Sequence, residues 1–144
     1  MAGDLELQLV LHGAVILLLG LLCGIPLGAT VARAGDEAAR PWRVAHSGGA
    51  MLGLMLLASG ATLARLRLDD LALSTLTWSL VTAGYAFMAG MVLAAVAGTR
   101  GLGPQGPALN RVVFLAFVVG SLGSVLGVVL TIRGAWAALP TGAG

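Results

Sequence analysis

Four long apolar stretches constrain the fold of this chain more than any other feature of its sequence. They cover approximately residues 7–31, 44–66, 71–97 and 111–136. Each is long enough to cross a hydrocarbon core of about 30 Å, which takes about 20 helical residues. Inside lipid the backbone must satisfy its own hydrogen bonds, and a helix does so within one segment. The sequence therefore predicts an all-α integral membrane four-helix bundle, with residues 1–144 forming a single membrane domain.

The composition agrees with a protein that lies in the lipid bilayer. The chain of 144 residues is 58% hydrophobic and only 10% charged, whereas a soluble domain carries about a quarter charged residues. Its basic residues are all arginines near the ends of the apolar stretches. Because they form no basic patch, we expect no nucleic-acid partner. Cys23 has no second cysteine to pair with, so we expect no internal disulfide.

The connections between the apolar stretches are short, which predicts that successive helices are antiparallel neighbours. We expect a first loop at residues 33–42, in which Pro41 is suited to open the second helix. Pro26 is expected to kink the first helix near its end. The third loop, 98–107, is rich in glycine and proline and predicts a series of turns.

Small residues recur in all four stretches, for example Gly120, Gly123 and Gly127 in the fourth. Small side chains let helix backbones approach closely in a membrane, so they favour tight packing between helices. The alternative is that a few of these glycines line a cavity for a ligand.

Acidic side chains are confined to the expected tails and loops. They are Asp4, Glu6, Asp36, Glu37, Asp69 and Asp70. Transporters driven by protons or cations normally place an ionisable residue within the membrane. The pattern therefore disfavours a transporter of that kind.

The most unusual residue is His46, about one turn inside the second apolar stretch. Its neighbours on the same helix face are Gly49, Ala50 and Gly53, so this face is a flat strip with an imidazole at its end. Such a strip can accept the backbone of a neighbouring helix. It can equally accept a flat macrocycle whose metal is bound by the imidazole.

A second histidine, His12, lies in the first stretch. A histidine at such a position often only hydrogen-bonds a carbonyl group or a lipid headgroup. With a rise of about 1.5 Å per residue, His12 and His46 should differ in depth by roughly 15 Å across a core of about 30 Å. They cannot share one metal within one chain. If His46 binds a haem, it does so alone and leaves the far face of the iron open, which favours substrate or gas chemistry.

At these residues the chain resembles the styrene oxide isomerase family. The resemblance covers the whole four-helix layout, and its most specific part is the motif Ala45-His46-Ser47-Gly48 with its spacing to His12. Further similar segments are His12-Gly13, Leu22-Cys23-Gly24, Trp42-Arg43-Val44, Trp78-Ser79 and Gly103-Pro104-Gln105-Gly106-Pro107. The resemblance implies that the protein binds haem b, with His46 as the axial ligand of the iron, and forms a homotrimer with the haem near a subunit interface.

The resemblance also implies an activity and a place in the cell. In that family the ferric iron acts as a Lewis acid on the oxygen of a small epoxide. The ring opens, a hydride shifts to the neighbouring carbon, and an aldehyde forms without net redox change. By the same resemblance we expect the chain in the inner membrane of a bacterium.

Three positions depart from the family pattern. The family has an asparagine where this chain has Leu52 and an aspartate where it has Leu76. The family tyrosine falls on Gly84, one residue before Tyr85, which we take as the candidate catalytic group near the substrate. The departures suit a relative with a different or smaller substrate, or a haem protein without isomerase activity.

Arginines near His46 are suited to pair with haem propionates. Arg43 lies three residues before His46 on the same face and nearer the membrane interface, while Arg111 and Arg40 approach the same side. The alternative is that they only anchor helix ends among lipid headgroups. The expected cofactor-binding residues are therefore His46, Arg43, Gly49, Gly53 and Arg111, with His46 as the metal ligand.

Two other functions stay open on the sequence alone. One is a non-catalytic membrane haem protein for gas binding, haem storage or electron transfer. The other is a structural membrane subunit without a cofactor. An absorption spectrum of the purified protein separates the structural subunit from both haem proteins.

The arginines also predict the orientation in the membrane. Five of them, Arg33, Arg40, Arg43, Arg100 and Arg111, flank the first and third loops, and three, Arg65, Arg67 and Arg133, lie on the opposite side. The positive-inside rule then places both termini outside the cytoplasm. Reporters fused to the C-terminus and inserted beside Asp69 should both report the non-cytoplasmic side. A cytoplasmic C-terminus would contradict this orientation.

Overall fold

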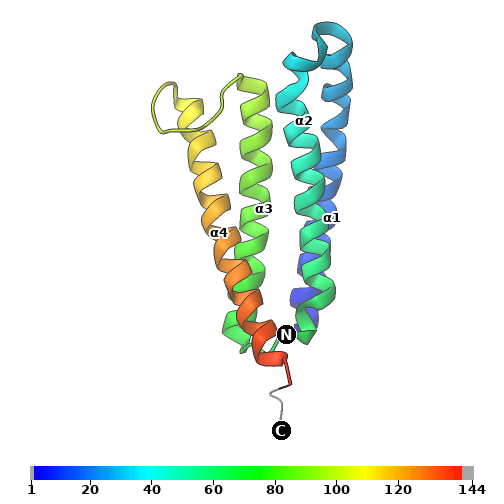
Figure 1. Ribbon diagram of the computed structural model, residues 1–144, viewed down its shortest axis with the longest axis vertical. Coiled ribbons are helices and arrows are strands. Elements are labelled where there is room, and N and C mark those ends of the chain that lie inside the picture. The colour runs from blue at the N-terminus through cyan, green and yellow to red at the C-terminus, as the bar shows by residue number, and fades with distance from the viewer. Residues whose placement is uncertain (1, 141–144) are drawn as a thin grey trace.

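The chain forms an elongated bundle of helices (Figure 1). The computed structural model describes residues 2–140, and within this range it contains no strand. Its elements are α1 (Ala2–Leu22), α2 (Gly24–Thr62), the 3-10 helix η1 (Leu63–Arg65), α3 (Asp70–Ala97) and α4 (Ala108–Ala138). The prediction of an all-α membrane bundle is confirmed.

Helix α2 consists of two rods that meet at Gly35. This residue has φ 81° and ψ 179°, which interrupts the helix, and a positive φ of this size is readily adopted only by glycine. In Figure 1 the chain reverses direction at this end of the bundle. The prediction of a loop at 33–42 is therefore wrong, because one glycine makes the reversal and the residues around it stay helical. Pro41 lies inside the second rod and does not open it.

Pro26 accounts for the break between α1 and α2. Proline has no backbone N–H and crowds the carbonyl four residues earlier, which here belongs to Leu22, the last residue of α1. Cys23 forms a turn at this point, and hydrogen bonding resumes from Leu27 N to Cys23 O at 3.2 Å. The helix is interrupted at Cys23, near the position of the expected kink, and α1 with the first rod of α2 forms one arm of the bundle.

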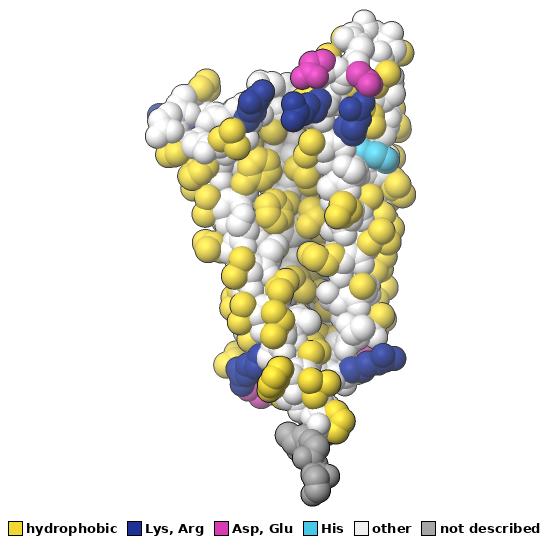
Figure 2. All heavy atoms as spheres, in the orientation of Figure 1, with side chains coloured by type: hydrophobic (Ala, Val, Ile, Leu, Met, Phe, Trp, Pro, Cys, Tyr) yellow, Lys and Arg dark blue, Asp and Glu magenta, His cyan; other side chains and the backbone are white. Residues whose placement is uncertain are grey.

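The described helices are long and apolar enough to cross a membrane. Three continuous stretches meet this criterion by length and composition: Gly3–Arg65, Asp70–Ala97 and Ala108–Ala138. The first turns back at Gly35 and so contains both arms of a hairpin. Figure 2 shows hydrophobic side chains over the middle of the bundle and basic side chains in two bands near its ends. This distribution is that of a protein surrounded by lipid.

Glycines set the spacing between the two arms of the hairpin. A Cβ added to Gly49 would lie 2.7 Å from Gly20 Cα, and one added to Gly53 would lie 2.5 Å from Leu17 N. Lipid tails give helices no hydrophobic reason to associate, so close van der Waals packing is the main attraction. The hairpin depends on these bare backbone surfaces.

Glycines also allow the close approach of α3 and α4. A Cβ on Gly120 would meet the Phe87 ring at 2.8 Å, and one on Gly123 would meet Ser79 O at 2.7 Å. One on Gly127 would overlap the Leu80 side chain. These glycines therefore serve the packing of α4 against α3. The two pairs meet mainly through α3.

The loop between α3 and α4 is held by one side chain. Asn110 Nδ2 donates to the carbonyl oxygens of Gly103 (2.8 Å) and Gln105 (2.7 Å), and its Oδ1 accepts from Gly101 N at 3.1 Å. Thr99 Oγ1 also donates to that oxygen. Positive φ values at Gly98, Gly101 and Gly106 make the turns that the sequence predicts.

We predict that Gly53→Ala destabilises the protein although alanine is the better helix former by about 1 kcal/mol. The new methyl group meets the α1 backbone, so the free energy of unfolding should fall by about 1–3 kcal/mol. Thermal unfolding in detergent measures this change. Gly28→Ala is the matched control, because a Cβ there has nothing within 4 Å. Equal stability of the two variants would contradict the packing argument.

Candidate functional site

His46 lies on the α1–α2 seam, near the end of the bundle where the hairpin turns. Its Nδ1 is 3.0 Å from Gly20 O, and its ring lies against Gly24, whose added Cβ would be 3.3 Å from Nδ1. A carbonyl oxygen only accepts hydrogen bonds, so Nδ1 must carry the proton. In the neutral ring, Nε2 then keeps its lone pair, and among residues 2–140 it forms no hydrogen bond.

This arrangement is the one that metal-binding histidines normally have. A ligating imidazole donates its other N–H to a carbonyl or carboxylate, which fixes the tautomer and makes the ring a better ligand. His46 is only partly buried, so part of its side chain lies at the surface of the bundle. His46 is suited to bind one metal centre from one side.

The flat strip beside His46 serves helix packing. Gly49, Ala50 and Gly53 face α1, and the Gly20 backbone fills the space in front of Gly49. A macrocycle cannot occupy a surface whose added Cβ atoms would already lie 2.5–2.7 Å from another helix. Gly49 and Gly53 are therefore packing residues in this chain, and our expectation that they contact a cofactor is not supported.

The two predicted propionate-binding arginines lie in different surroundings. Arg43 follows the turn at Gly35, and its Nη2 pairs with Asp36 Oδ1 at 2.8 Å. It stays on the face of His46. Arg111 lies in the first turn of α4, and α4 packs mainly on α3, whereas His46 faces α1. Within a single chain, Arg111 is therefore not beside His46.

The other histidine forms a separate polar cluster deeper in the bundle. His12 Nδ1 lies 2.9 Å from the hydroxyl oxygen of Tyr85. The His12 ring meets Tyr85 and Trp78 edge to face, with centroids 5.5 and 5.9 Å away. Along α1, His12 is eight residues from Gly20, about 12 Å at 1.5 Å per residue. The two histidines therefore lie at different depths.

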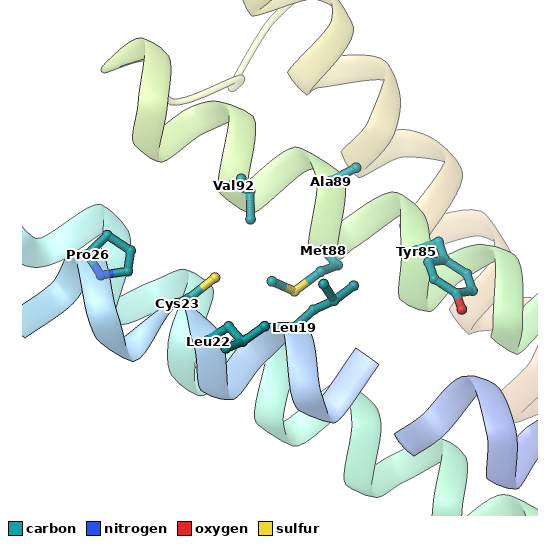
Figure 3. A pocket seen from close by; sticks show the side chains of 8 residues that line it. All are labelled: Leu19, Leu22, Cys23, Pro26, Tyr85, Met88, Ala89 and Val92. Carbon is teal, nitrogen blue, oxygen red and sulfur yellow. The ribbon is translucent and has the colours of Figure 1, made fainter. Parts of the chain in front are cut away.

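Tyr85 is consequently not beside His46 within one chain. It lies at one end of a groove of about 400 Å³ between α1 and α3, which is lined by Leu19, Leu22, Cys23, Pro26, Tyr85, Met88, Ala89 and Val92 (Figure 3). His46 does not line this groove. The expectation that Tyr85 lies near the substrate stays a prediction; within one chain its hydroxyl is bonded to His12.

Two of the three departures from the family pattern, Leu76 and Gly84, are buried, and Leu52 is half-buried. Leu76 is almost fully buried in the core formed by α1, α2 and α3. Leu52 packs against that core and against α3, and Gly84 lies against Ile16 and Leu56. Apolar residues at these positions build a hydrophobic core where the family pattern has polar side chains.

Sequence reasoning missed two partnerships. The first is the bond from His46 to a backbone carbonyl of α1, which leaves no trace in residue type. The second is the His12–Tyr85 pair, in which two side chains 73 residues apart in the sequence join α1 to α3. Only the register of α3 against α1 produces it.

The fold defines a small all-α membrane protein. At one end of its helical hairpin it carries a histidine with the hydrogen bond that metal-binding histidines usually have. A family model described as styrene oxide isomerase matches residues 5–136. The chain belongs to the styrene oxide isomerase family. Comparison with curated proteins gives no match.

Proposed function

We propose that this protein binds haem b through His46 Nε2 and isomerises a small epoxide to an aldehyde. The observation that carries the proposal is the hydrogen bond from His46 Nδ1 to Gly20 O, 3.0 Å long, in a chain that belongs to the styrene oxide isomerase family. The bond leaves Nε2 with a lone pair and a fixed direction. Both are needed for an axial ligand.

The residues around His46 fit such a group. Gly20 and Gly24 keep the α1 side of the ring free of side chains, and Arg43 lies one turn closer to the membrane interface. An arginine at that depth is suited to pair with a propionate. Because the ring is partly exposed on the outside of the hairpin, a macrocycle on it needs cover from another chain. This supports a homo-oligomer, and the family resemblance indicates a trimer.

When bound, ferric haem supplies a Lewis acid for the epoxide oxygen. The rearrangement moves one hydrogen between adjacent carbons and needs no external oxidant or reductant. The chain contributes the ligand, held by the Gly20 carbonyl, and an apolar setting that excludes water. Leu76 lies within the core and Leu52 lines a groove with Gly48 and Met51, and neither side chain can hydrogen-bond a substrate.

The same apolar positions favour one second candidate, a non-catalytic haem protein for gas binding, haem storage or electron transfer. Leu76 is about 1% exposed and lies within the core. The polar groups that could position an epoxide are thus replaced while the ligand histidine is kept. A measurement of isomerase activity distinguishes the isomerase from the non-catalytic haem protein. A measurement of haem content does not, because both would bind haem.

The cofactor is tested by spectroscopy. Protein purified from haem-replete cells should show an intense Soret band, and His46→Ala should remove most of it because the protein's proposed bond to the iron is lost. The matched control is His12→Ala, which removes the other intramembrane imidazole and should retain haem. A colourless wild-type preparation would overturn the cofactor assignment. Loss of the band in His12→Ala alone would overturn the choice of ligand.

The activity is tested by incubating ferric protein with styrene oxide and measuring phenylacetaldehyde. We expect turnover that requires ferric iron, falls on reduction, and is about 10²-fold slower than in an enzyme with polar positioning groups, since orientation contributes at least that much. His46→Ala supplemented with haemin is the control. A wild-type rate no higher than that of free haemin would replace the isomerase by the non-catalytic haem protein.

A further inference from the structure

A groove on the side of α2 away from α1 has no role in the proposed haem site. On α2 it is lined by a stripe with helical spacing that includes Arg40, Val44, Gly48 and Met55. The opposite wall comes from α3, with Phe87, Met91 and Ala94, and from Phe117 of α4. Two hollows of about 420 and 710 Å³ share Met91 and form one continuous surface.

The mouth of this groove is positively charged. Arg40 from α2 and Arg100 from the loop after α3 both line its upper hollow. Glu37 lies there too, 3.9 Å from Arg40. Arg100 forms no ion pair within residues 2–140. The mouth therefore keeps a net positive charge. Figure 2 shows a row of basic side chains near this end of the bundle, with acidic side chains above it and hydrophobic ones below.

The groove runs parallel to α2 from the interface into the bilayer. Arg40 and Met55 are 15 residues apart, which corresponds to about 22 Å along the helix. One leaflet of the hydrocarbon core is about 15 Å deep, half of about 30 Å. A single chain from one leaflet can therefore follow the groove over most of its length. The lower hollow is lined almost entirely by apolar side chains, namely Met51, Leu52, Leu54, Met55, Phe87 and Met91 with Gly48.

We propose that this groove binds one anionic phospholipid, with its phosphate between Arg40 and Arg100 and an acyl chain along Val44, Met91 and Phe87. Arginine binds phosphate through paired N–H groups, and basic pockets between membrane helices are suited to anionic headgroups. A free phosphate lacks the apolar part, and a zwitterionic headgroup brings a cation to the arginines. The inference does not depend on haem, because the groove lies on the opposite side of α2 from His46.

Native mass spectrometry of delipidated protein tests the proposal with two lipids that differ only in headgroup. Dioleoyl phosphatidylglycerol should bind about tenfold more tightly than dioleoyl phosphatidylcholine, the gain expected from about 1.4 kcal/mol of added charge-assisted bonding. Glycerol phosphate without acyl chains should not bind. Equal affinity for the two lipids, or binding of the headgroup alone, would overturn the proposal.

Matched variants locate the site. Arg40→Gln with Arg100→Gln should remove the tenfold preference, whereas Arg65→Gln with Arg133→Gln, at the opposite end of the bundle, should retain it. Equal effects of the two pairs would show only general attraction to anionic lipid and overturn the proposal. So would a loss of haem from the Arg40 and Arg100 pair, since the groove would then belong to the cofactor.

A cross-linking measurement tests whether a second copy covers the groove instead. In a Cys23→Ala background, Met55→Cys places one thiol in the lower hollow. If lipid occupies the groove, a bifunctional thiol reagent should leave this variant as single chains. Efficient cross-linking between two chains would show that the groove is an interface between copies, and the lipid proposal would fail.

Discussion

The contact between the bare backbones of α1 and α2 is the interaction on which the rest of the structure depends. Gly20 and Gly49 approach so closely that neither position can carry a side chain without moving a helix. In lipid this close packing replaces the hydrophobic effect as the attraction between helices. The same approach brings Gly20 O within 3.0 Å of His46 Nδ1. The same close contact therefore packs the two helices together and orients the imidazole of His46.

Both histidines inside the bundle have a hydrogen-bond partner within the described residues. His46 binds a backbone carbonyl at one end, while His12 and Tyr85 bind each other about 12 Å deeper. An imidazole in lipid is costly unless it has a partner. The two histidines have different partners. His12 Nδ1 lies beside a hydroxyl, which can donate or accept, whereas His46 Nδ1 lies beside a backbone carbonyl, which only accepts and so fixes the tautomer. The fixed tautomer is the arrangement suited to a metal ligand.

Family membership carries over unevenly to single residues. The motif around His46 is retained, and the structure gives this histidine the hydrogen bond of a ligand. Tyr85 was expected near the substrate and Arg111 near the propionates, and within one chain neither residue lies beside His46. A helix turns side chains by about 100° per residue. Assignments that rest on sequence offset alone are therefore sensitive to a shift of one position.

The sequence by itself determined the all-α membrane class, the approximate helices, the glycine-rich turns between α3 and α4, and the family. These follow from hydropathy, residue type and a short motif, which are local properties. Tertiary structure alone decided that one glycine reverses the hairpin, that the strip at Gly49 and Gly53 is filled by α1, and that Tyr85 binds His12. These depend on the register and rotation of one helix against another. Several nearly equivalent small-residue surfaces can satisfy helix packing, so only the folded bundle shows which of them meet.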